Sequence, residues 1–228
     1  MGTLKTLQSA DSHSFEVYVA QPNGVIKGAV VIAPEIFGVN RYIRSVADHF
    51  AEHGYLTAAP ALFDRVTPKY EATYEQPNDE KGIAIIGKIP FEQALSDLQA
   101  TVNDVKLTQA KVSMVGFCWG GTLAWLASAK IAGLCATVSY YPGGIASNGD
   151  LKPLCPVMLH LGERDQSPTP EAAKTVLAKH PTLLNYFYPT GHGFNCDQRA
   201  SYSADDAALS QARTVDFLDL CASRWVSQ

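Results

Sequence analysis

The chain has 228 residues, a net charge of −4 at pH 7 and a hydrophobic content of 46%. This composition is typical of a folded globular protein. The acidic balance gives no reason to expect nucleic acid or an anionic membrane as a partner. The first residues lack the apolar core of a signal peptide, and no apolar run is long enough to span a bilayer. We therefore expect a cytoplasmic protein.

Five cysteines are scattered along the chain without a CxxC pair or the spacing of a zinc site. This usage fits a reducing compartment. The histidines do not cluster with them either. We predict no metal and no cofactor, and the sequence leaves a monomer and a weak homo-oligomer equally open.

Hydrophobic periodicity predicts an alternation of strands and helices in the first half of the chain. Residues 60–89 contain three prolines and mixed charge, which predicts a long excursion with little regular structure. Asn40 is placed to cap a helix, and Gly54 is placed to follow its last turn. The predicted elements are strands over 15–21, 27–33 and 55–59, a helix after Asn40 and a helix over 91–106.

The second half of the chain continues the alternation. Its predicted strands cover 112–117, 134–140, 156–161 and 183–188, and its predicted helices cover 122–130, 171–180 and 204–225. Strands that alternate with helices form a mostly parallel sheet with helices on both faces. We therefore predict one α/β domain over residues 1–228.

One short motif lies between a predicted strand and a predicted helix, Gly116-Phe117-Cys118-Trp119-Gly120. It matches the pattern glycine-x-nucleophile-x-glycine, with cysteine in place of the commoner serine. A strand that turns sharply into a helix strains the backbone of the nucleophile and leaves no room for side chains two residues away. The helix N-terminus also favours a thiolate. The alternative is a buried structural cysteine beside packing glycines.

Four predicted strands are each followed by a loop with one reactive residue: Glu35, Cys118, Asp165 and His192. Active sites of parallel sheets lie at these carboxyl ends of the strands. The order nucleophile, acid, histidine is the order of the α/β-hydrolase triad. We therefore predict an α/β-hydrolase fold with a cysteine nucleophile.

Four segments carry a resemblance to a known family: 34–38 (PEIFG), 116–121 (GFCWGG), 162–165 (GERD) and 191–194 (GHGF). They resemble the dienelactone hydrolases, or carboxymethylenebutenolidases, and the similarity extends from about the first strand to the last helix. The resemblance implies a triad of Cys118, His192 and Asp165. It also implies that Glu35 pairs with the resting thiol and helps to form the thiolate when substrate binds.

Each implied residue has a chemical role. Cys118 attacks an ester or lactone carbonyl and forms a thioester, while His192 carries the proton and Asp165 orients the imidazole. Backbone N–H groups of Trp119 and Ile36 are expected to stabilise the oxyanion.

The substrate is less well indicated than the catalytic residues. Family members that open dienelactone hold its carboxylate with arginines, one of them a few residues after the catalytic histidine. Here Cys196 lies where that arginine is expected, and Arg199 follows three residues later. Lys81, or less favourably Arg65, is the nearest candidate for the other cation. The aromatic candidates to line the pocket are Phe37, Tyr140, Tyr141 and Phe194, for which plain packing is an equal alternative.

The leading hypothesis is a cysteine hydrolase of a small ester or lactone. A second hypothesis gives the same triad a different carboxylic ester as substrate. A third is a non-catalytic binding protein with this fold, although a binding protein has no need of four reactive residues. A fourth is a redox role for Cys118 with Cys196 as the resolving thiol.

Overall fold

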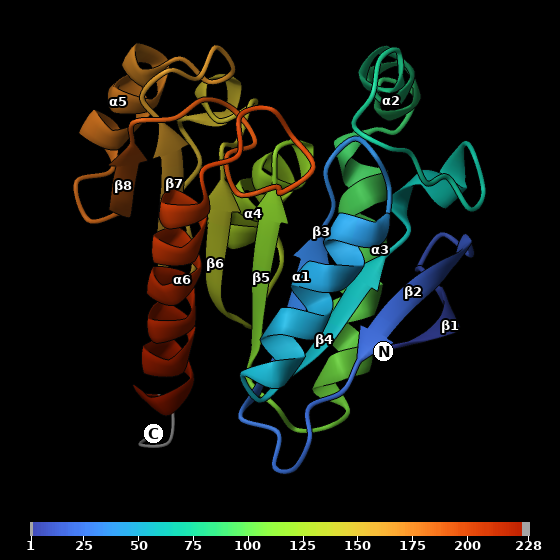
Figure 1. The fold of residues 1–228 in the computed structure, drawn as a ribbon. Helices are drawn as coiled ribbons and strands as arrows, with labels where there is room; N and C mark the ends of the chain where they lie inside the picture. Colours follow the sequence, from blue (N-terminus) through green and yellow to red (C-terminus); the bar gives the residue numbers. More distant parts are fainter. Residues whose placement is uncertain (1, 225–228) are drawn as a thin grey trace. The chain divides into compact units, whose positions relative to one another are not determined.

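The computed structural model describes residues 2–224, and the chain forms two compact units, Met1–Ser113 and Met114–Gln228 (Figure 1). The chain passes from one unit to the other within strand β5 (Val112–Phe117). Each unit builds its core from strands and helices that alternate along the chain. The single-domain organisation of the whole chain stays a prediction.

The strands of the first unit follow the order β1 (Thr3–Gln8), β2 (Ser14–Ala20), β4 (Tyr55–Pro60) and β3 (Gly28–Ala33). β1 and β2, and β2 and β4, pair antiparallel, whereas β3 and β4 are parallel. The helical elements are α1 (Arg41–Glu52), η1 (Leu62–Arg65), α2 (Asn78–Ile86) and α3 (Phe91–Lys106). Within this unit α1 lies in front of the strands in Figure 1 and α3 behind them.

The burial of this unit follows its sequence. β3 and β4 are buried along their whole length, as expected of apolar strands covered on both faces. The side chain of Asn40 accepts a hydrogen bond from the amide of Ile43 at 3.2 Å and so caps α1. Gly54 follows the last turn with a φ of 94°, a conformation that glycine adopts without strain. Both predictions for this helix are confirmed.

In the second unit the strand order is β5, β6 (Leu134–Tyr140), β7 (Val157–Gly162) and β8 (Leu184–Tyr188), with β6, β7 and β8 parallel. Its helices are α4 (Trp119–Lys130), η2 (Ala146–Asn148), α5 (Pro170–Lys179) and α6 (Ala204–Arg224). α4 is buried almost all round, because its sequence is apolar on every side. α6 packs on β6 and β7 from the other face, in front in Figure 1.

Two predictions about the first unit were wrong. Residues 60–89 are more regular than expected, because they contain η1 and α2. The proline before α2 marks a helix start as well as a loop, since proline fits the beginning of a helix. The strand β1 was not predicted at all, because its side chains are mostly exposed and lack a clear apolar face.

The other predicted elements formed within a few residues of their expected ends. The predicted end of the last helix at Trp225 lies outside the described residues. None of the helices formed by residues 2–224 combines the length and the apolar character that a membrane crossing requires.

Candidate active site

The turn between β5 and α4 consists of Cys118 alone. β5 ends at Phe117 and α4 begins at Trp119, and Cys118 between them has φ 55° and ψ −115°. A non-glycine residue rarely adopts this conformation, and such strain clusters at functional sites. Gly116 makes the turn possible, because a Cβ at that position would overlap the carbonyl of Gly120. The amide of Cys118 donates to the carbonyl oxygen of Tyr140 at 3.1 Å and so ties the turn to β6.

The position of Cys118 suits a reactive thiol. It is the N-cap residue of α4, and its side chain is half-buried. The positive end of the helix dipole lies at this terminus and favours a negative charge on the sulfur. Trp119, the first residue of the helix, has its amide on the same terminal turn.

The loops after β7 and β8 are tied to each other. The amide of Arg164 donates to the carbonyl oxygen of Thr190 at 2.9 Å. Gly162 allows the close approach, because a Cβ there would lie 2.6 Å from the same carbonyl oxygen. These contacts bring Asp165 and His192 together from two different strand ends.

Asp165 holds the imidazole of His192 through two contacts. Nδ1 of His192 lies 2.9 Å from one carboxylate oxygen and 3.2 Å from the other. Asp165 is only 1% exposed, and it also accepts the amide of Ser167 at 2.7 Å. A buried carboxylate on Nδ1 fixes the ring, so that the other ring nitrogen is available for proton transfer.

The proton on His192 is strongly held. Burial by itself lowers the pKa of this imidazole, but a negative charge on Cys118, hydrogen bonds to Asp165 and Cys118, and the charge of Asp165 raise the pKa of His192 to about 10. The imidazole is thus within hydrogen-bond reach of the Cys118 side chain. The structure brings together the three predicted triad residues within one unit.

The predicted aromatic residues of this unit separate into two groups. Tyr140 is core, because its ring stacks on Phe117 at 4.7 Å and its hydroxyl contacts that of Thr214 at 2.7 Å. Tyr141 instead lies against His192, with 4.9 Å between the two ring centres. Tyr141 also has a φ of 37°, so the chain is strained beside the histidine. Phe194 is fully buried and packs on Tyr141. The structure thus gives Tyr140 and Phe194 packing roles.

Glu35, Ile36 and Phe37 lie in the first unit, in the loop after β3, and all three are buried. The hydroxyl of Tyr74 donates to a carboxylate oxygen of Glu35 at 2.6 Å, and the Tyr74 ring packs on Phe37 at 4.4 Å between ring centres. Tyr74 was not predicted from the sequence. The only signal was an aromatic residue in an otherwise polar stretch of the excursion.

The predicted cations differ in their surroundings. Lys81 is exposed on α2, with its Nζ 5.5 Å from the ring centre of Tyr70. Arg65 is tied to Asp97 and Asp11, at 2.7 and 2.8 Å, so its charge is matched within the fold.

Arg199 lies close to the triad. A Cβ at Gly193, the residue after His192, would be 2.7 Å from Nε and 3.0 Å from Cζ of Arg199. Cys196, at the position where an arginine was expected, is fully buried. The guanidinium group of Arg199, three residues after Cys196, therefore lies near His192.

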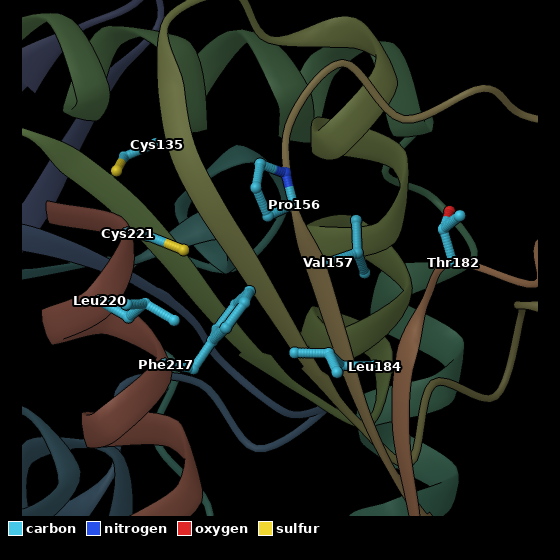
Figure 2. Close-up of a pocket in the computed structure, with 8 residues that line it drawn as sticks. All are labelled: Cys135, Pro156, Val157, Thr182, Leu184, Phe217, Leu220 and Cys221. Atoms are coloured by element: carbon cyan, nitrogen blue, oxygen red, sulfur yellow. The ribbon is translucent and has the colours of Figure 1, made fainter. Parts of the chain in front are cut away.

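A separate apolar pocket of about 240 Å³ lies at the other end of the same strands (Figure 2). Its lining residues come from the amino ends of β6, β7 and β8 and from α6: Cys135, Pro156, Val157, Thr182, Leu184, Phe217, Leu220 and Cys221. The triad residues follow the carboxyl ends of strands, so this pocket is not next to them. Among residues 2–224, no group of three or more His, Cys, Asp or Glu side chains is arranged to hold a metal ion.

A strained turn with a cysteine after one strand of a mostly parallel sheet, with an aspartate and a histidine after two later strands, is the arrangement of an α/β hydrolase. The model of the dienelactone hydrolase family matches residues 15–221. The chain belongs to the dienelactone hydrolase family and is a hydrolase.

Known relatives agree with this assignment over most of their length. The carboxymethylenebutenolidase of Pseudomonas putida is 30% identical over 226 residues, which cover 93% of this chain and 94% of that protein. A Synechocystis protein named "Putative carboxymethylenebutenolidase" is 34% identical over 211 residues, with 84% and 85% covered. The solved structure of the "Putative Dienelactone Hydrolase" from Klebsiella pneumoniae has a TM-score of 0.78 at 27% identity, covering 95% of this chain and 98% of that one. The predicted family and α/β-hydrolase fold are confirmed.

Proposed function

We propose that the protein hydrolyses small carboxylic esters or lactones with Cys118 as the nucleophile. One observation carries the proposal: the imidazole of His192 is held by Asp165, lies within hydrogen-bond reach of Cys118 and has its pKa raised to about 10. A thiolate and an imidazolium stabilise each other as an ion pair, which is how cysteine hydrolases activate their nucleophile.

The reaction then has two halves. The Cys118 thiolate attacks the carbonyl carbon, and the N–H group of Trp119 stabilises the oxyanion that forms, with Ile36 as the predicted second donor. Collapse of the tetrahedral intermediate breaks the ester bond, and the His192 imidazolium gives its proton to the leaving oxygen. In the second half His192 takes a proton from water, which attacks the thioester and releases the acid and the thiolate. For a lactone, the alcohol and the acid remain one molecule.

The substrate class follows from the relatives and from one cation. Proteins named carboxymethylenebutenolidase are similar to this chain over nearly its whole length. We propose a small lactone or ester that carries a carboxylate, with Arg199, whose side chain lies against Gly193, as the partner of that carboxylate. Lys81 and Phe37 stay predicted substrate contacts. A neutral ester is the alternative, and the relative rates on the two classes distinguish them.

A substrate panel with the wild-type chain and Cys118→Ala tests this function. The wild-type chain should hydrolyse dienelactone and neutral aryl esters, and Cys118→Ala should lose turnover of both by about 10³-fold or more. Acid quenching during turnover of a slow ester should leave an acyl group on the peptide that contains Cys118. Turnover by Cys118→Ala at the wild-type rate would contradict the proposal.

A matched variant addresses the substrate charge. Arg199→Gln should raise KM for the acidic lactone by about tenfold, because an ion pair with the carboxylate is lost, and should leave KM for neutral esters within about twofold. An equal effect on both substrates would reject Arg199 as the carboxylate partner. The cytoplasmic location, the oligomeric state and the binding-protein alternative stay predictions, and tight binding without turnover would support the last of these.

A further inference from the structure

Residues 70–74 of the excursion pack directly on the loop that carries Glu35. The amide of Ala72 donates to the carbonyl oxygen of Phe37 at 3.0 Å, and the side chain of Asn40 donates to the carbonyl oxygen of Ala72 at 3.0 Å. Gly38 forms an isolated β-bridge with Glu71. The shape of the loop therefore depends on a segment about 35 residues later in the chain.

Tyr74 is the residue of this segment that reaches the carboxylate. Its hydroxyl donates to Oε2 of Glu35 at 2.6 Å, and Glu35 is completely buried. Its ring packs on Phe37 at 4.4 Å and meets the edge of Tyr42 at 6.2 Å. A short hydrogen bond to a carboxylate is stronger than one between neutral groups, and it also fixes the direction of the carboxylate.

Helix α2 approaches the same loop from the other end of the excursion. Gly82 is buried, and a Cβ at this position would overlap the carbonyl oxygen of Ile36. Glycine inside a helix is unfavourable relative to alanine, so its presence here needs a reason. The close approach to Ile36 supplies that reason. Tyr74 and Gly82 thus contact two successive residues of the loop.

We propose that Tyr74 is a positioning residue, which acts through Glu35 and fixes the direction of its carboxylate. This inference rests on the proposed function, because its readout is ester hydrolysis, and on the role in the reaction that the family resemblance implies for Glu35. In this proposal Tyr74 influences the reaction through Glu35. The hydroxyl is the decisive group, since a phenyl ring would stack on Phe37 equally well.

The chain offers a matched control for this hydroxyl. Tyr70 belongs to the same segment, and its ring stacks on Phe63 at 5.0 Å. Within the described residues, the Tyr70 hydroxyl is buried and has no hydrogen-bond partner. Tyr70→Phe therefore removes a hydroxyl from the same segment without removing a hydrogen bond, whereas Tyr74→Phe removes the bond to Glu35.

The experiment is a double-mutant cycle on ester hydrolysis by the full chain. Tyr74→Phe should lower kcat by about tenfold with KM within about twofold, because a hydrogen bond to a charged group is lost. Tyr70→Phe should stay within about twofold of wild type. In a Glu35→Ala background, Tyr74→Phe should have no further effect. Glu35→Gln, which keeps the shape of the side chain, replaces Glu35→Ala if thermal melting shows that the alanine variant is unfolded.

The outcomes separate the two levels of inference. Wild-type activity of both Glu35 variants would refute the role in the reaction that the family resemblance implies for Glu35. Slow Glu35 variants with a fully active Tyr74→Phe would overturn the positioning role alone. The positioning role would also be overturned if the Tyr74 and Glu35 effects were additive, or if Tyr70→Phe lost as much activity as Tyr74→Phe.

Discussion

At the scale of single residues, the charge of His192 is the property on which the chemistry depends. Its pKa is raised to about 10 against the effect of burial, with Cys118 as the largest raising influence and Asp165 next. A group whose pKa is raised stays protonated below that value and loses its proton as the pH rises through it. The imidazolium should therefore persist throughout the neutral range.

Nuclear magnetic resonance of the ring nitrogens tests this charge. The ¹⁵N shifts of His192 should be those of an imidazolium at about pH 8 and should change only as the pH rises toward about 10. Cys118→Ala should move that titration to lower pH, because the negative charge that most favours the imidazolium is gone. A neutral ring at pH 7 in the wild-type protein would contradict the ion pair, and an unchanged titration in Cys118→Ala would assign the raised pKa to Asp165 alone.

The two neighbouring tyrosines show what the sequence could not resolve at this scale. Tyr140 is the last residue of β6, whereas Tyr141 follows the strand with a φ of 37°, which turns the chain so that the two side chains diverge. One hydroxyl therefore meets Thr214 on α6, while the other ring meets His192. The sequence predicted that both tyrosines lie near the carboxyl ends of the strands. The positions of α6 and of the loop that carries His192 decide which tyrosine packs in the core and which one contacts His192.

At the scale of elements, α2 has a part in shaping the loop of Glu35 and Ile36. Gly82→Ala should lower kcat by about tenfold or more, because the new methyl group would push against the backbone of Ile36 and displace its amide, which is a predicted oxyanion donor. The control is Gly87→Ala at the end of the same helix. There the new Cβ would have the Ile83 carbonyl oxygen at 3.4 Å as its nearest neighbour, and φ is −60°.

Gly87→Ala should therefore keep its activity and should be as stable as wild type or slightly more stable. Steady-state kinetics on a neutral ester and thermal melting of both variants provide the measurements. Full activity of a folded Gly82→Ala variant would show that the contact between α2 and the loop has no influence on catalysis.

The sequence predicted elements well where local pattern decides them. The strand Val112–Phe117, the helix Phe91–Lys106 and the strand Leu134–Tyr140 have their predicted limits, because each is a continuous or regularly spaced apolar pattern. The failures are elements that depend on distant partners. β1 is defined by pairing with β2, and α2 by its contact with the loop after β3. Neither partner is visible in the local pattern.

At the scale of the whole molecule, the same distinction applies to the site. The positions of Glu35, Cys118, Asp165 and His192 at strand ends could be predicted, because each follows a recognisable strand. The contact between Tyr74 and Glu35 could not be predicted, because the two residues are 39 positions apart and Tyr74 lies in an irregular stretch. Reactive residues at strand ends can thus be predicted from topology, whereas the residues that support them depend on how the excursion folds back.

The five thiols of the molecule differ enough in environment to be separated by one reagent. Cys135, Cys196 and Cys221 are at most 7% exposed. Burial raises the pKa of the partly exposed Cys155 to about 11, so that only about one part in a thousand is thiolate at about pH 8. Cys118 is half-buried at a helix N-terminus beside an imidazolium. Its thiolate should react much faster than the other four.

Iodoacetamide at about pH 8 should therefore add once to the native protein, on the peptide that contains Cys118, and esterase activity should fall at the rate of that addition. Cys118→Ser should gain no adduct on this time scale, and the reduced chain in denaturant should gain five, one for each cysteine. A first adduct on Cys155 would refute the ranking of the thiols. Activity that survives complete modification of Cys118 would exclude it as the nucleophile, because an alkylated sulfur is a neutral thioether that cannot become a thiolate and cannot form a stable thioester.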